Sequence, residues 1–169
     1  MKTKTITDID VKGKKALVRV DFNVPLSSKN PADHITVTDD ARIRAALPTL
    51  NYLLDQGAAL ILCSHLGRPS SAADKQYAMN PIADRLSELL GRPVKKMNEV
   101  VGPSVTAAVR AMQPGDIILL ENTRFEPGET KNNPELSQKL ADLADIFVED
   151  AFGSVHRAHS STEGAARMI

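Results

Sequence analysis

Four apolar runs along the chain each end in the same kind of polar segment. The runs are ALVRV, AALILCS, IILLEN and IFVEDAFGS, and the polar residues at or after their ends include Asp21, Asn23, His65, Arg68, Arg124, His156, Arg157 and His159. Continuous apolar runs of this kind are typical of strands that are covered on both faces. If the strands are parallel, their polar endings lie along one edge of a sheet, where open α/β sheets bind ligands.

The polar and turn-forming residues between these runs divide the chain into further elements. Strands are predicted over 16–22, 58–63, 116–121 and 146–149, with a weaker strand near 93–97. Helices are predicted from 38 or 39 to 57, over 80–91, over 102–112 and from 133 to 144. The first helix is expected to carry acids in its first turn, and Pro48 predicts a kink or a break inside it. Asn80 and Asn133 each precede a proline, a pattern typical of a helix start.

Strands and helices therefore alternate throughout the chain. This alternation predicts a doubly wound, mainly parallel α/β sheet with helices on both faces, a Rossmann-like three-layer sandwich. The length of 169 residues fits one domain with a substantial core, and no repeat or linker divides it. The chain ends in STEGAARMI, on an apolar residue just after its most polar segment, so we expect it to be cut short.

Charge and composition narrow the classes of partner. The chain has 21 basic and 21 acidic residues, no Trp, two Tyr and four Phe. Zero net charge and few aromatic rings argue against binding to nucleic acid or to an anionic membrane. The single cysteine, Cys63, excludes an intrachain disulfide and fits a reducing compartment. A polar N-terminus and no membrane-length apolar stretch lead us to expect a soluble, cytoplasmic protein.

The polar endings carry groups that suit a small, multiply charged anion. Arg68, Arg124 and Arg157, with His65 nearby, would present several N–H donors to a phosphate. Each charge pair is worth roughly 4 kcal/mol at about 4 Å and an effective dielectric near 20, before desolvation. A phosphorylated ligand would therefore offset the repulsion among clustered cations.

Three further residues extend this constellation. Asp21 and Asn23 share a face of an extended segment and offer an acceptor and an amide to a substrate hydroxyl. Arg42 lies near the start of the first long helix, where the helix dipole disfavours a cation, which suggests a role outside helix stability. Arg44 follows two residues later and faces elsewhere, so it serves as a control position.

Each of these residues also has an ordinary structural interpretation. A single arginine at a strand end is usually solvated or salt-bridged, and Asp21 could cap a turn. His156 and His159 could suggest a metal site, but no Cys or carboxylate stands beside them at ligand spacing. Cys63 fits a core position better than a reactive one, and the adjacent acids Glu149 and Asp150 point to opposite faces of a strand. The functional interpretation depends on several weak signals that converge on one sheet edge.

Five segments together resemble the N-terminal domain of the phosphoglycerate kinase family. They are VRVDFNVP (18–25), ARIRAALPTL (41–50), SHLGRP (64–69), LLENTRF (119–125) and EDAFGSVHRAHSS (149–161), in the family's order and spacing. The resemblance extends over essentially the whole chain but covers less than half of a family member. Members of this family transfer a phosphoryl group between 1,3-bisphosphoglycerate and ADP to give 3-phosphoglycerate and ATP.

The resemblance implies a role for each matching residue. Asp21 and Asn23 would contact the glycerate chain and its hydroxyl, and Arg42 would act catalytically beside the carboxyl or acyl-phosphate end. The phosphate that is not transferred would be held by His65, Arg68, Arg124 and Arg157. His156 and His159 would support this basic patch, and no metal site is implied.

The resemblance also implies what this chain lacks. It contains no G-x-x-x-x-G-K-[ST] loop and no G-x-G-x-x-G, and the family's Mg-ATP or Mg-ADP is bound by a C-terminal domain absent from this chain. We therefore expect no cofactor on this chain and, as in the family, a monomer. Alone, it is expected to bind 3-phosphoglycerate but to turn over slowly or not at all.

Three functions remain open from the sequence. The chain is half of a phosphotransferase, a metabolite-binding module without chemistry, or a polyanion binder that uses the same arginines. Zero net charge and scant aromatic content weigh against the third.

Overall fold

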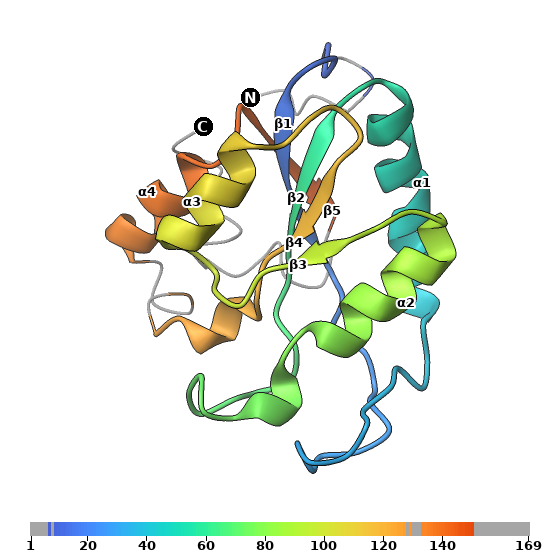
Figure 1. Cartoon of the computed structure of the whole chain (residues 1–169), viewed down its shortest axis with the longest axis vertical. Coiled ribbons are helices and arrows are strands. Elements are labelled where there is room, and N and C mark those ends of the chain that lie inside the picture. The colour runs from blue at the N-terminus through green and yellow to red at the C-terminus, as the bar shows by residue number, and fades with distance from the viewer. Residues whose placement is uncertain (1–6, 8, 128, 130–132, 151–169) are drawn as a thin grey trace.

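The computed structural model describes Thr7, residues 9–127, Glu129 and residues 133–150. Its centre is a five-stranded sheet in which every strand pairing is parallel (Figure 1). The strands are β1 (Lys15–Val20), β2 (Ala59–Cys63), β3 (Lys95–Lys96), β4 (Ile117–Leu119) and β5 (Ile146–Asp150), in the order β3-β4-β2-β1-β5. All five predicted strands are present, including the weak one near 93–97.

Helices cover both faces of this sheet, which confirms the predicted three-layer α/β fold. The helices are α1 (Ala41–Asp55), α2 (Asn80–Leu90), α3 (Pro103–Arg110) and α4 (Pro134–Ala141), and two short 3₁₀ helices are η2 (Lys75–Tyr77) and η3 (Thr123–Phe125). Figure 1 shows α1 and α2 on one side of the sheet and α3 and α4 on the other. Each face of the sheet has its own apolar core, one packed against α1 and α2 and one against α3 and α4. Because side chains alternate along each strand, Val18 and Val20 of β1 lie in the core beside α1 and α2, and Leu17 lies in the other.

The first helix differs from its prediction at its start, and of the kink or break predicted at Pro48 the break does not occur. It begins at Ala41, and its first turn holds no acid, because Asp39 and Asp40 lie just before it. The side chain of Asp39 accepts a hydrogen bond from the backbone N–H of Ala41 at 2.9 Å, so it precedes the helix instead of forming part of it. The helix is not broken at Pro48, which lies inside α1.

Packing explains why α1 continues through this proline. Pro48 lies on the exposed side of the helix, while Ile43, Ala46, Leu50 and Leu53 form a buried stripe that spans it. The carbonyl that loses its intrahelical partner at a proline can be solvated on such a face. The apolar stripe therefore outweighs the local cost of proline.

Two other helix ends follow the predicted signals, and one differs. Asn133 caps α4, because its side-chain Oδ1 accepts hydrogen bonds from the N–H groups of Glu135 and Leu136. Gly91 ends α2 in the left-handed conformation, with φ of 67°. Asn80 differs from its predicted role as a cap, since it is already the first residue of α2.

Within the described ranges, every helix is too short or too polar to cross a lipid bilayer.

The parallel topology determines where the predicted site lies. All strands run the same way, so their carboxyl ends lie at one edge of the sheet, here called the carboxyl edge. The segments that follow β1, β2 and β4 leave the sheet at this edge, and they carry Asp21, His65 and Arg124.

Candidate functional site

A buried serine joins the strand ends at the carboxyl edge. Ser64 directly follows β2, and its Oγ accepts a hydrogen bond from the backbone N–H of Phe22 at 2.9 Å. The same hydroxyl donates to the carbonyl of His65 at 2.9 Å, and the Ser64 carbonyl accepts from the N–H of Thr123 at 3.1 Å. The segments after β1, β2 and β4 are therefore in direct contact through one small residue.

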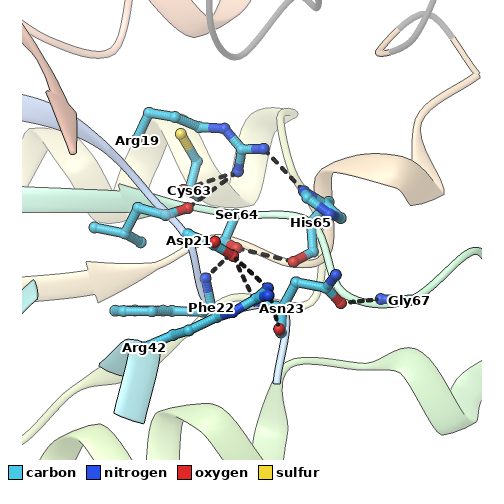
Figure 2. Close-up of polar contacts among 10 residues, drawn as sticks. Arg19, Asp21, Phe22, Asn23, Arg42, Cys63, Ser64, His65 and Gly67 are labelled. Carbon is cyan, nitrogen blue, oxygen red and sulfur yellow. Dashed lines mark hydrogen bonds and ion pairs between the residues drawn. The ribbon is translucent and has the colours of Figure 1, made fainter. Parts of the chain in front are cut away.

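Asp21, Asn23 and Arg42 form a cluster beside this junction. Arg42 reaches back from the first turn of α1 and donates through Nη1 to the Asn23 carbonyl at 2.8 Å (Figure 2). The same nitrogen lies 3.4 Å from Asp21 Oδ1, which also accepts the backbone N–H of Asn23 at 3.2 Å. The Arg42 side chain is 55% exposed, so its ion pair with Asp21 is screened by water and contributes little to stability. Arg42 is thus held at the carboxyl edge and still open to a ligand.

Gly67 connects this cluster to the loop after β2. Its N–H donates to Asn23 Oδ1 at 2.8 Å, and its carbonyl accepts from Arg124 Nη1 at 3.2 Å. Because an N–H group can only donate, the Asn23 atom that faces it must be the oxygen, and Asn23 keeps its NH₂ group to offer to a ligand. Gly67 has φ of +61°, and a Cβ there would overlap the ring of Tyr77. Only glycine fits this position without strain.

A second buried amide, Asn122, holds the same loop from the side of β4. Its Oδ1 accepts the N–H groups of Leu66 and Arg124, both at 3.1 Å, and its NH₂ group donates to the carbonyls of Leu66 at 2.7 Å and Tyr77 at 3.0 Å. Sequence analysis assigned no role to Asn122, although an amide directly after an apolar strand was a visible signal. The residue fixes the loop that carries His65 and Arg68 next to η3, which carries Arg124.

A largely buried ion pair between Lys96 and Glu121 supports the backbone of Asn122. Lys96 in β3 pairs with Glu121, and the two side chains are 12% and 7% exposed. Glu121 Oε1 also accepts the backbone N–H groups of Met79 and Asn122, both at 2.8 Å. A carboxylate with this many partners is well compensated for its burial. The start of α2 and the end of β4 are therefore fixed relative to each other.

The predicted basic residues are brought together in part. Arg124 contacts the loop of 65–68 through Gly67, and His65 and Arg68 lie on that loop. The side chain of Arg68 is exposed and, within the described part of the chain, makes no hydrogen bond or ion pair. Arg157, His156 and His159 lie outside the described residues, so their predicted roles stay predictions. In the described part of the chain, no three His, Cys, Asp or Glu residues form a metal-binding group.

Arg44 behaves as the predicted control. It turns away from Asp21 and pairs with Asp40 at 2.9 Å, and Asp40 also pairs with Arg85 of α2 at 2.8 Å. Hydrogen bonds from Arg44 and then Arg85 hold the pKa of Asp40 below its usual value. The two arginines of the motif therefore have separate partners, one at the carboxyl edge and one on the outer surface.

Arg19, the charged residue inside the run ALVRV, was not among the predicted site residues. Arg19 is fully buried in β1, and its Nη1 donates to the carbonyls of Val20 at 3.3 Å and Cys63 at 3.4 Å. Its Nη2 lies 3.0 Å from Nδ1 of His65. The signal was a cation interrupting an otherwise apolar strand, which is rare without compensation.

Burial raises the pKa of Cys63 to about 12, so this thiol is protonated at neutral pH and belongs to the core.

Comparison with known proteins shows the family of the chain. A family model described as phosphoglycerate kinase matches residues 6–169. The phosphoglycerate kinase of Pelotomaculum thermopropionicum is 54% identical over 169 residues, which are 100% of this chain and 42% of that protein. That of Moorella thermoacetica is 53% identical over 165 residues, which are 98% of this chain and 40% of that protein.

Solved structures give the same result. The phosphoglycerate kinase of Coxiella burnetii superimposes with a TM-score of 0.82 at 36% identity, over 97% of this chain and 39% of that one. For the enzyme of Pyrococcus horikoshii the TM-score is 0.84 at 32% identity, over 96% and 40%. The chain spans about two fifths of the length of these relatives. With a matching family model over nearly its whole length, the chain belongs to the phosphoglycerate kinase family.

Proposed function

We propose that this chain is the N-terminal, substrate-binding part of a phosphoglycerate kinase and that it binds 3-phosphoglycerate or 1,3-bisphosphoglycerate at the carboxyl edge. The observation that supports this most is the continuous series of contacts from Arg42 through Asn23 and Gly67 to Arg124. It gathers two arginines, a carboxylate and an amide from three separate segments onto one edge of the sheet. A phosphorylated hydroxy acid offers a complementary phosphate, hydroxyl and carboxylate.

In this proposal the phosphate that is not transferred binds to the basic residues of the edge. Arg124 and Arg68 offer planar guanidinium groups that match two phosphate oxygens, and His65 adds a further N–H. Arg157, with His156 and His159 in support, completes this set on the segment after β5. The Asn23 NH₂ group and the Asp21 carboxylate bind the hydroxyl of the glycerate chain.

Arg42 is assigned to the reacting end of the substrate. When ATP forms, a β-phosphate oxygen of ADP attacks the phosphorus of the acyl phosphate, and the bond from that phosphorus to the carboxyl oxygen breaks. The carboxylate of 3-phosphoglycerate leaves with the bonding electrons, so no proton has to move. Catalysis of such a transfer depends on positioning and on charge stabilisation, which a half-exposed arginine can provide.

In this proposal the nucleotide does not bind to this chain. Mg-ATP or Mg-ADP would bind to a C-terminal nucleotide-binding domain of the same enzyme, and this chain would carry no cofactor. The two parts would have to close on each other to bring the substrates together and exclude water. The chain alone would therefore bind substrate with little or no turnover. The proposal includes no nucleic acid or membrane partner, and the protein would be a cytoplasmic monomer.

Calorimetric titration of the chain with 3-phosphoglycerate tests the binding step. Loss of a charged hydrogen bond costs about 1.5–3 kcal/mol, so Arg68→Ala should weaken binding roughly 10- to 100-fold. Arg68 is exposed, so this change leaves the fold intact. Arg44→Ala removes an arginine outside the cluster and should bind as the wild type does. Absence of saturable binding to the wild type would exclude the proposed ligand for this chain.

A coupled assay with an added nucleotide-binding domain tests the catalytic step. We expect activity to appear only when both parts are present, and Arg42→Met to lower kcat by about 10³-fold with a smaller effect on KM. Arg44→Met should keep wild-type kcat. If substrate binds and the added domain binds nucleotide, yet no activity appears, the chain is instead a non-catalytic module that binds anionic metabolites.

A further inference from the structure

A buried arginine lies directly behind the histidine of the proposed site. Arg19 is fully buried in β1, and its Nη2 atom lies 3.0 Å from Nδ1 of His65 (Figure 2). Its Nη1 atom donates to the carbonyls of Val20 and Cys63. Arg19 therefore contacts His65, the first residue of the loop of 65–68, from inside the sheet.

This contact determines which atom of His65 carries the ring proton. A guanidinium group has only donors and stays protonated at any working pH, so the nitrogen that faces it must accept. Nδ1 of His65 is then unprotonated, and the ring proton lies on Nε2, at the tip of the ring. The hydrogen bond made by one ring nitrogen sets the state of the other in this way. The opposite tautomer would set an N–H of His65 against an N–H of Arg19.

The sheet itself fixes the position of Arg19. The strand register pairs Arg19 with Cys63 of β2 on one side and with Glu149 of β5 on the other, all three on the same face. Burial is the main cause that raises the pKa of Cys63; Arg19 opposes this shift, while Glu129 and Glu149 add to it. The carboxylate of Glu149 thus lies on the strand next to the buried guanidinium. Arg19 is a buried cation whose place in the sheet depends on backbone pairing.

We propose that Arg19 is a positioning residue that keeps His65 neutral with its proton on Nε2, so that His65 offers one hydrogen-bond donor to the untransferred phosphate. A fully ionised phosphate accepts hydrogen bonds and donates none, so it requires an N–H at the tip of the ring. Arg19 need not touch the ligand to act in this way. The identity of the ligand depends on the proposed function, whereas the tautomer of His65 does not.

The tautomer can be measured directly in the unmodified chain. The protein is labelled with ¹⁵N-histidine, and the ring nitrogens are observed by NMR at neutral pH, with His65→Gln used to assign the signals of His65. We expect a neutral ring with the proton on Nε2. A ring protonated on Nδ1, a mixture of the two tautomers, or a doubly protonated ring would overturn the proposal. This measurement depends on no variant at position 19 and on no ligand.

Variants then connect the tautomer to binding. Arg19→Met removes the donors, and we expect a mixture of His65 tautomers together with about 10-fold weaker binding of 3-phosphoglycerate. Arg19→Lys keeps a cationic donor and should partly restore the wild-type tautomer of His65 and the wild-type affinity. Arg44→Met should change neither. If folded Arg19→Met keeps the wild-type His65 signals, the proposal is wrong.

Two further outcomes separate the relation between Arg19 and His65 from the assignment of the ligand. If Arg19→Met does not fold, the wild-type spectrum and Arg19→Lys decide the question. If the wild-type tautomer is as expected but 3-phosphoglycerate does not bind, the ligand assignment fails and the Arg19–His65 relation stands.

Discussion

At the scale of single residues, backbone atoms take part in the candidate site as fully as charged side chains do. Gly67 uses its N–H to bind Asn23 and its carbonyl to bind Arg124, and Arg42 binds the carbonyl of Asn23. The positions of both arginines therefore depend on the path of the main chain. A substitution that moves the backbone at Gly67 should disturb the site without removing any charge.

Gly67→Ala tests this dependence, with Gly13→Ala as a matched control. Both glycines have positive φ, but a Cβ at Gly67 would overlap the Tyr77 ring, whereas at Gly13 it would have nothing within 4 Å. The backbone cost alone is about 1 kcal/mol, and overpacking adds about 1–3 kcal/mol. Urea unfolding should show a loss of about 1 kcal/mol for Gly13→Ala and about 3 kcal/mol for Gly67→Ala. Equal losses would show that the contact with Tyr77 is unimportant.

The sequence identified the charged residues of the site better than the residues that hold them. Asp21, Arg42 and Arg124 were recognisable because they follow apolar runs or stand against a helix dipole. Ser64 and Asn122 act on backbone groups of other strand ends, so their roles depend on which strands are neighbours. That information is absent from local patterns of hydrophobic and polar residues.

At the scale of elements, the site is built from connections between strand ends. Asn122 joins the end of β4 to the loop after β2 and to η2 by three hydrogen bonds, and a fourth caps its own 3₁₀ helix, η3. Asn133 has a local role, since it caps its own helix, α4. Both asparagines cap a helix, and Asn122 in addition connects separate elements.

Asn122→Ala and Asn133→Ala should therefore differ in both stability and binding. Removal of Asn122 leaves the backbone groups of buried Leu66 unpaired, which should cost about 3 kcal/mol. Removal of the Asn133 cap should cost about 1 kcal/mol. Chemical denaturation and titration with 3-phosphoglycerate would measure both, and only Asn122→Ala should weaken binding. Equal effects on affinity would contradict the role of Asn122 in positioning the loop.

The order and type of elements were predictable, because buried parallel strands and amphipathic helices leave different periodic patterns. The start of α1 was harder to predict, since Asp39 and Asp40 suit either a first turn or the residues before it. The side chain of Asp39 accepts a hydrogen bond from the N–H of Ala41, which places Asp39 before the helix. This contact forms only when the loop is folded, so the local sequence does not reveal it. The helix continues through Pro48 for a related reason, because the buried stripe of α1 outweighs the local preference of proline.

At the scale of the whole molecule, the doubly wound architecture was predictable and the strand order was not. Alternating strands and helices lead to a parallel sheet with two covered faces. The order β3-β4-β2-β1-β5 depends on pairing between strands far apart in the sequence, such as β1 with β5. The sheet thereby brings Arg19 between Cys63 and Glu149, a neighbourhood that no local pattern indicates.

The dependence of overall stability on acid should reflect Asp40, which joins the start of α1 to α2 through Arg44 and Arg85. Hydrogen bonds from Arg44 and then Arg85 lower the pKa of Asp40 from its ordinary 3.8 in the folded state. As the pH falls, the unfolded chain takes up this proton first, so the stabilisation is complete above 3.8 and is lost below it. The difference in unfolding free energy between wild type and Asp40→Asn should be constant near neutral pH and shrink in acid. A difference that grows in acid would contradict this sign.

The pairing of β1 with β5 has a consequence for synthesis on the ribosome. β1 is translated early, yet its neighbour on one side, residues Ile146–Asp150, emerges only after more than a hundred further residues. Until then a nascent chain exposes unpaired N–H and C=O groups along one side of β1. Arg19, the last residue but one of β1, places a charge on this unpaired strand, and a charge of this kind makes an exposed strand a poor template for aggregation.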